Sequence, residues 1–130
     1  MKLQREKVLI DTSVWIEFLK GKNKDIVDKV KALILANRAL LCGVVISELL
    51  VGVRKKKERD VLAKALGAIQ YVEADKDTWI LAGELGEDLS SKGINIPLTD
   101  LIIAALALKN DYKVFTSDPH FTHIKGIKLL

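Results

Sequence analysis

The stretch KVLIDTSVWIEFLKG (residues 7–21) decides the fold, because it changes from one kind of structure to another at an acidic residue. Its first part is a compact apolar run that ends at Asp11, which is typical of a buried strand. Thr12 and Ser13 suit the start of a helix, and Gly21 suits its end. The sequence therefore predicts a strand over 7–11 followed at once by a helix over 12–21.

The same alternation continues along the rest of the chain. Apolar residues at helical spacing predict helices over 24–37, 44–57, 58–66, 76–93 and 98–110, where 58–66 extends or restarts the helix before it. Short apolar runs predict strands over 39–43, 69–75, 112–118 and 127–130. Strands that alternate with helices imply a parallel sheet covered on both faces, so the predicted fold class is α/β, a three-layer α/β/α sandwich.

Length and composition limit the class of protein. A chain of 130 residues suits one compact domain over 1–130, and 49% hydrophobic with 29% charged residues argues against disorder. Cys42 is the single cysteine, which excludes an intrachain disulfide and a thiolate zinc cluster and fits a reducing cytosol. No apolar segment has the length of a signal or a membrane span, so a cytoplasmic protein is expected.

Four acidic residues are expected to share one edge of this sheet. Asp11 and Asp118 stand where predicted strands end, and the carboxyl ends of parallel strands form the functional crevice of such folds. Asp100 opens a helix that is apolar on every side over 101–108, and Glu48 lies near the start of a helix that follows a strand. Both should also point towards that edge.

The position of each acid can also be explained without a shared functional site. Asp11 and Asp100 suit the starts of helices, where a carboxylate satisfies free backbone N–H groups. Glu48 suits a solvated helix surface, and Asp118 before Pro119 suits a turn. The joint pattern of four acids favours a common site where no single member does.

Four carboxylates packed together repel one another, and each raises the pKa of its neighbours unless a cation neutralises them. A set of oxygen ligands suits a hard ion such as Mg²⁺ or Mn²⁺ better than zinc, and one or two ions fit equally well. Such an ion can activate water and stabilise the charge that grows on a phosphate. The expected chemistry is therefore phosphodiester hydrolysis.

The segments VLIDTSVWIEFL, VVISELLVG, LTDLIIAALAL and VFTSDPHF resemble, in order and spacing, the four acidic motifs of the PIN-domain ribonucleases. They cover nearly the whole chain, and it is most similar to the VapC-like toxins of type II toxin–antitoxin pairs. The resemblance implies a parallel sheet of about five strands. It also implies that the catalytic and metal-binding residues are Asp11, Glu48, Asp100 and Asp118.

Within that resemblance, Asp11 and Asp100 match the direct metal ligands, and Asp118 matches the position whose role varies most across the family. Ser13 and Thr116 match supporting polar residues. The resemblance further implies Mg²⁺ or Mn²⁺ as cofactor, RNA as substrate, a homodimer, and a VapB-like antitoxin whose C-terminal segment blocks the acidic crevice. The particular RNA and its cleavage site do not follow from the motifs.

Some residues near the acids are left out of the predicted site. His120 and His123 follow Asp118, but two histidines in a loop are more often incidental than functional. The basic run RKKK (54–57) is compatible with RNA phosphates, as is the net charge of +4, but a charge run at a helix end is usually a solvated surface.

Other classes of protein match the sequence less well. A haloacid dehalogenase needs a second Asp where Ser13 stands, and neither glycine-rich nucleotide-binding motif is present. A receiver-like phosphotransfer domain also clusters acids at strand ends, but the adjacent acids that it needs early in the chain are missing. A catalytically silent PIN module that only binds RNA or a protein remains the second candidate.

Overall fold

The computed structural model describes residues 6–130, and its centre is a parallel β-sheet. The sheet has five strands in the order β3-β2-β1-β4-β5. Their bounds are β1 (Val8–Ile10), β2 (Ala39–Cys42), β3 (Gln70–Val72), β4 (Lys113–Phe115) and β5 (Lys128–Leu129). The prediction of a parallel sheet of about five strands is confirmed.

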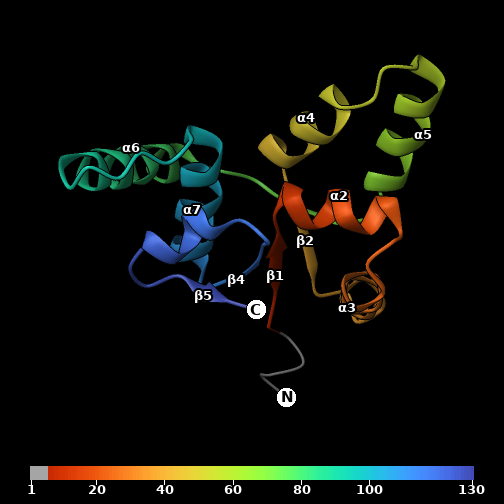
Figure 1. Cartoon of the computed structure of the whole chain (residues 1–130), viewed down its shortest axis with the longest axis horizontal. Coiled ribbons are helices and arrows are strands. Elements are labelled where there is room, and N and C mark those ends of the chain that lie inside the picture. Colours follow the sequence, from red (N-terminus) through yellow and green to blue (C-terminus); the bar gives the residue numbers. More distant parts are fainter. Residues whose placement is uncertain (1–5) are drawn as a thin grey trace.

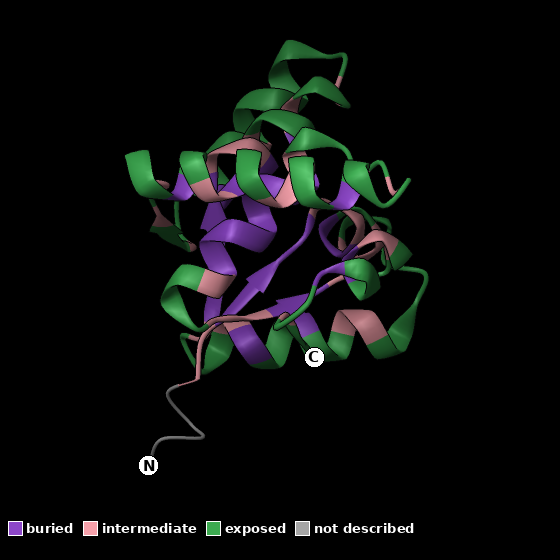
Figure 2. Ribbon diagram, turned by 90° about the vertical axis from the view of Figure 1, so that its left-hand side faces the viewer, coloured by how far each residue is buried: buried purple, intermediate pink, exposed green. Residues whose placement is uncertain are grey.

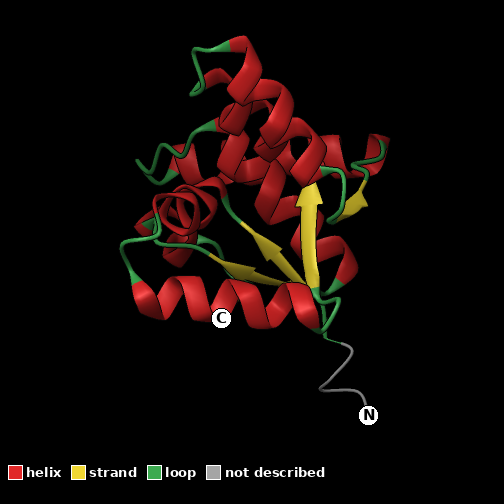
Figure 3. Ribbon diagram, turned by 90° about the vertical axis from the view of Figure 1, so that its right-hand side faces the viewer, coloured by secondary structure: helices red, strands yellow, loops and turns green. Residues whose placement is uncertain are grey.

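Helices cover both faces of this sheet in the described part of the chain, with α2 and α3 on one face and α6 and α7 on the other (Figures 1 and 3). The predicted α/β/α sandwich is therefore confirmed. The helices are α2 (Thr12–Lys20), α3 (Lys24–Leu35), α4 (Gly43–Val51), α5 (Lys56–Leu66), α6 (Lys76–Ser91), α7 (Leu98–Asn110) and the 3₁₀ helix η1 (Pro119–His123).

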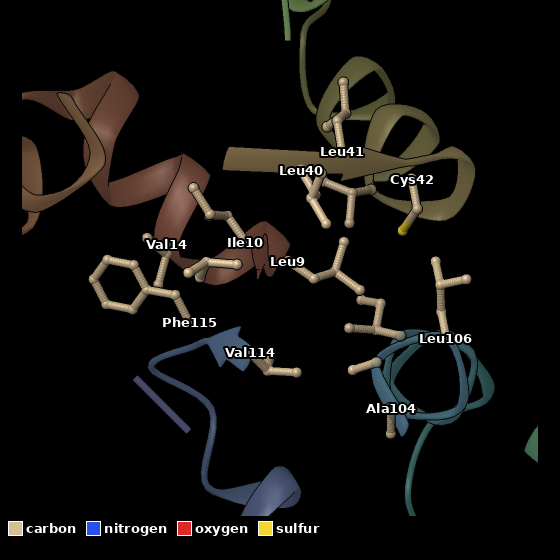
Figure 4. Close-up of a cluster of buried hydrophobic side chains, with 14 of the residues drawn as sticks. Leu9, Ile10, Val14, Leu40, Leu41, Cys42, Ala104, Leu106, Val114 and Phe115 are labelled. Atoms are coloured by element: carbon tan, nitrogen blue, oxygen red, sulfur yellow. The ribbon is translucent and has the colours of Figure 1, made fainter. Parts of the chain in front are cut away.

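The core lies where the central strands meet the helices of the two faces. β1 is completely buried, and residues 101–107 of α7 are buried all round, as their uninterrupted apolar sequence predicts (Figure 2). Figure 4 shows Val14 of α2 beside Ile10 and Phe115, with Ala104 and Leu106 of α7 on the other side of the sheet. Burial on both faces explains why the strand sequences are apolar runs and do not alternate.

The order of the strands reverses beside β1. The chain passes from β1 to β2 and β3 on one side, then crosses back to place β4 against the other side of β1. Ile10 pairs with Phe115 at the carboxyl end of both strands. In open parallel sheets a crevice forms at such a reversal, so Asp11 and the residues after Phe115 lie where a site is expected.

Several predicted boundaries were wrong. The last turn of the predicted 44–57 helix is absent, because α4 ends at Val51 before Gly52 and α5 begins at Lys56. Within α4 the buried residues are Val45 and Leu49, whereas Ile46 and Leu50, and Val53 after the helix, are only partly buried.

Helix α6 runs without interruption through two glycines. A Cβ atom at Gly86 would lie 2.8 Å from the Leu101 side chain of α7, so Gly86 allows the two helices to approach closely. A Cβ atom at Gly83 would meet nothing within 4 Å. Residues 6–130 contain no helix that is both long and apolar enough to cross a membrane.

Candidate active site

Asp11 lies directly after β1 and is 3% exposed, so its carboxylate needs protein partners. Two hydroxyl groups supply them, because Ser13 Oγ and Thr116 Oγ1 each donate a hydrogen bond to Asp11 Oδ2 at 2.8 Å. Asp11 precedes the first turn of α2 in extended conformation, but its side chain makes no capping hydrogen bond. The explanation of Asp11 as a helix cap is therefore wrong.

Glu48 projects from the middle of α4 and is exposed. Thr12 Oγ1, in the residue next to Asp11, donates a hydrogen bond to Glu48 Oε1 at 2.7 Å. Glu48 also borders a cleft of about 310 Å³ that Tyr71 and Trp79 line with Thr99, the residue before Asp100. The Glu48 carboxylate is therefore fixed beside Asp11 and next to open space.

Asp100 and Asp118 meet at a third residue, His120. The Nδ1 atom of His120 lies 2.8 Å from Asp100 Oδ2 and 3.0 Å from Asp118 Oδ1. A nitrogen that faces two carboxylate oxygens carries a proton and donates it. In the described part of the chain, Asp100, Asp118 and His120 form the one group of three acidic, histidine or cysteine residues whose ligand atoms lie within 4.8 Å of one another.

A continuous chain of hydrogen bonds joins Asp11 to this group. The backbone N–H of Asp118 donates to Thr116 Oγ1 at 2.9 Å, and that hydroxyl donates to Asp11. The structure thus brings Asp100 and Asp118 within ligand distance of each other, with Asp11 adjoining them through Thr116. Ser13 and Thr116 contact Asp11 as supporting residues would, and their hydroxyl oxygens lie 3.4 Å apart.

The electrostatics of the site reflect this crowding. Burial raises the pKa of Asp100, the His120 hydrogen bond lowers it, and the charges of Asp11 and Asp118 raise it again. Burial also raises the pKa of the Cys42 thiol to about 11, to which the charges of Asp11 and Glu48 contribute. The hydrogen bond to Asp100 raises the pKa of His120.

No lysine or arginine within residues 6–130 lies at ion-pair distance from any of the four acids, although exposed acids elsewhere have such partners. Among the basic side chains that the structure describes, His120 alone reaches them. The donor set consists of carboxylate and hydroxyl oxygens with a single imidazole, which fits a hard divalent cation and does not fit a thiolate zinc centre. The acidic cluster is therefore compatible with a divalent metal ion.

His120 is the site residue that sequence analysis missed. Sequence analysis placed His120 close to Asp118 but left it out of the predicted site, whereas the structure places its ring between Asp100 and Asp118, on a 3₁₀ helix that Asp118 caps. The signal was present in the Asp-Pro-His order, since an Asp that caps a turn lies next to the side chain two residues on. His123 is exposed, and the basic run 54–57 spans the loop before α5 and its first turn.

The fold and the position of the acids define the class of protein. It is an α/β protein with a carboxylate site at the point where the strand order of a parallel sheet reverses. Residues 8–127 match the model of the PIN domain family. The chain therefore belongs to the PIN domain family, and the resemblance drawn from its four acidic motifs is confirmed.

Known proteins with related sequences and folds fall in the same group. Ribonuclease VapC21 of Mycobacterium tuberculosis is 33% identical over 98 residues, which cover 72% of this chain and 71% of the relative. Ribonuclease VapC5 of the same species is 30% identical over 124 residues, with 91% and 87% covered. The DNA-bound VapBC complex of Salmonella typhimurium contains a chain that superimposes on this one with a TM-score of 0.83 at 22% identity. The match covers 96% of this chain and 97% of that chain and shows that the two share a fold.

Proposed function

We propose that this chain is a metal-dependent endoribonuclease of the VapC type, which hydrolyses RNA phosphodiester bonds and acts as the toxin of a toxin–antitoxin pair. Asp11, Glu48, Asp100 and Asp118 are its catalytic acids, and Ser13 and Thr116 support them. The observation that carries the proposal is that acids from four separate segments adjoin one sheet edge, with no lysine or arginine of residues 6–130 at ion-pair distance from them. The relatives named as ribonucleases support the same activity.

The proposed cofactor of this site is Mg²⁺ or Mn²⁺, which Asp11, Glu48, Asp100 and Asp118 would hold. When bound, such an ion activates water and offsets the negative charge that grows on a phosphate during ester cleavage. It also reverses the local sign of an acidic pocket that would otherwise repel RNA.

The protein's own residues prepare that site. The hydroxyls of Ser13 and Thr116 both donate to Oδ2 of Asp11, so Oδ1 has no hydrogen-bond partner among residues 6–130 and is available to a ligand. Thr12 fixes Glu48 at the border of the adjacent cleft, through which a polynucleotide can approach. Fixed carboxylates reduce the reorganisation that binding and reaction would otherwise require.

Cleavage of RNA by the purified full chain tests the activity, with Mn²⁺, with Mg²⁺ and with EDTA. We expect cleavage only with a divalent ion, and a loss of at least about 100-fold in Asp11→Ala and Asp100→Ala, as for removal of a group that stabilises reacting charge. Asp28→Ala is the matched control, because Asp28 is an exposed acid of α3 paired with Lys24. Wild-type rates in both site variants would reject the assigned residues.

The second candidate, a silent PIN module, makes a different prediction for the same samples. It binds RNA equally with and without the ion and cuts none of it. Mapping of cleaved ends in cellular RNA after a brief pulse of expression would then identify the substrate of an active enzyme, which the motifs and the fold leave open.

A VapB-like antitoxin is the proposed protein partner, as in the VapBC complexes whose toxin chains share this fold. An apolar groove of about 320 Å³ lies between α2, α4 and α5, and Glu48 borders it. Ile16 and Leu19 expose 41% and 52% of their surface there, so a partner segment in the groove would gain apolar contacts and reach the acids. Expression with and without the neighbouring upstream reading frame tests this role, and unimpaired growth without that frame would contradict it.

We further propose that the chain forms one PIN domain over 1–130, works in the cytoplasm and forms a homodimer. Trp79, Ile80 and Leu98 are each at least half exposed on α6 and at the start of α7, which supports self-association through that surface. Light scattering after size-exclusion chromatography would give twice the 14.4 kDa chain mass for a dimer, and Trp79→Glu should then lower it, whereas Leu35→Glu on α3 should not.

A further inference from the structure

His120 occupies a position between two of the proposed metal-binding acids, on a turn that the structure holds firmly. Asp118 caps η1, because its Oδ1 accepts the backbone N–H of His120 at 2.9 Å. Pro119 restricts the first residue of the turn, and Phe121 is completely buried beneath it. The backbone thus sets the place from which the imidazole extends towards α7.

Asp100 depends on this imidazole more than Asp11 or Asp118 depends on any one donor. Asp11 receives two hydroxyl groups, and Asp118 also receives a backbone N–H. Within residues 6–130, the carboxylate of Asp100 has one hydrogen-bond partner, His120 Nδ1, at 2.8 Å. Asp100 is 8% exposed, so solvent replaces that donor poorly.

We propose that His120 is a positioning residue of the acidic site, whose Nδ1–H holds Asp100 Oδ2 and Asp118 Oδ1 close together and leaves their other oxygens free for a divalent cation. The inference rests on the proposed function, because it assigns His120 a task in the same site. Without the shared donor the two carboxylates repel each other and separate. Removal of a hydrogen bond that orients a metal-binding side chain typically weakens metal affinity about 10–100-fold.

The test measures Mn²⁺ binding by isothermal titration calorimetry on the full chain, with MnCl₂ alone as the probe and no RNA present. His120→Ala should bind Mn²⁺ about 10–100-fold more weakly than the wild type. His120→Asn should retain affinity close to wild type, because an Asn amide nitrogen reaches the place of Nδ1. His120→Gln should not, because its longer side chain carries the amide past that place.

His123→Ala is the matched control, because His123 lies on the same short helix, is exposed and has no contact with the acids. Its affinity for Mn²⁺ should equal that of the wild type. Circular dichroism of each variant shows whether the chain remains folded, and the Asn variant tests the proposal even where the Ala variant is destabilised. RNA cleavage by His120→Ala should recover at saturating Mn²⁺, since the residue acts through metal binding.

The possible outcomes separate the two proposals. If His120→Ala binds Mn²⁺ as tightly as the wild type or more tightly, the imidazole is a bystander or competes with the ion, and the positioning role is overturned while the ribonuclease proposal stands. If His120→Asn binds as weakly as His120→Ala, the ring itself is a ligand and the role is again overturned. If the wild type binds no Mn²⁺, both proposals fail together.

Discussion

Replacing Thr116 with valine removes one hydroxyl group that serves two acids and leaves the shape of the side chain nearly unchanged. Thr116 Oγ1 donates to Asp11 Oδ2 at 2.8 Å and accepts from the backbone N–H of Asp118 at 2.9 Å. The variant therefore takes one of two donors from a buried carboxylate and leaves the N–H group that starts the η1 turn without its acceptor.

The size of the effect follows from these two bonds. A hydrogen bond to a charged group contributes about 1.5–3 kcal/mol and one between neutral groups about 0.5–1.5 kcal/mol to stability. Thr116 is only partly buried, so water replaces some of the loss, and we expect the free energy of unfolding to fall by about 1–2 kcal/mol. For a chain of this length that corresponds to a melting temperature lower by roughly 3–8 °C.

Urea unfolding in EDTA measures this loss without a contribution from bound metal, and Thr116→Ser is the matched control because it keeps the hydroxyl. RNA cleavage by the valine variant should fall about 10–100-fold, as for other residues that orient metal-binding carboxylates. Equal stability and equal cleavage of the serine and valine variants would refute the reasoning, because the hydroxyl is then irrelevant to both acids.

Three further changes test other parts of the structure. Gly83→Ala should raise the free energy of unfolding by about 0.5–1 kcal/mol. Gly86→Ala should raise it less, because the new Cβ would lie 2.8 Å from Leu101 Cδ1. Equal increases for the two variants in urea unfolding would contradict the close approach of α6 and α7 at Gly86. Cys42, with its pKa raised from 9.0 to about 11, should be a thiolate in about 0.1% of folded molecules at pH 8 against about 10% when unfolded. Ellman's reagent should therefore label it slowly in the native protein, and stability should decline as the pH rises from 9 towards 11. Asp100→Asn should stabilise the protein in EDTA at pH 7, because the raised pKa of Asp100 means that folding disfavours its ionised form. The difference in the free energy of unfolding between variant and wild type should vanish below the ordinary pKa of 3.8. Mn²⁺ should raise the melting temperature of the wild type and not that of the variant.

The elements of the fold were predictable where one face or all faces of a segment are buried. The strand before Asp11 and the all-apolar helix around 101–108 follow from hydrophobicity alone, because parallel strands and central helices lose contact with water on every side. The boundaries were not predictable in the same way. β4 stops at Phe115, not at residue 118, because the following residues use their side chains and N–H groups to bind Asp11 and Thr116 in place of a neighbouring strand.

The positions of Asp11 and Asp118 were predictable because a rule of topology connects them. Residues after β1 and β4 come together wherever parallel strands end, whatever lies between them in sequence. His120 follows no such rule, since its contact with Asp100 depends on the direction in which a short 3₁₀ turn presents the ring. Sequence spacing shows that Asp118 and His120 are near each other, but only coordinates show that Asp100 lies on the same side of the turn.

Polar residues beside Asp11 and Asp118 give the first and fourth acidic motifs further hydrogen-bond donors. Thr12 and Ser13 follow Asp11 in sequence, yet Thr12 binds Glu48 of another segment. Likewise Thr116 precedes Asp118 and binds Asp11, and His120 follows Asp118 and binds Asp100. The first and fourth segments therefore carry donors for acids of other segments, so loss of one such donor loosens two segments at once. Such shared donors keep mutually repelling carboxylates at one edge before a cation is bound, which is the physical condition for a preformed metal site.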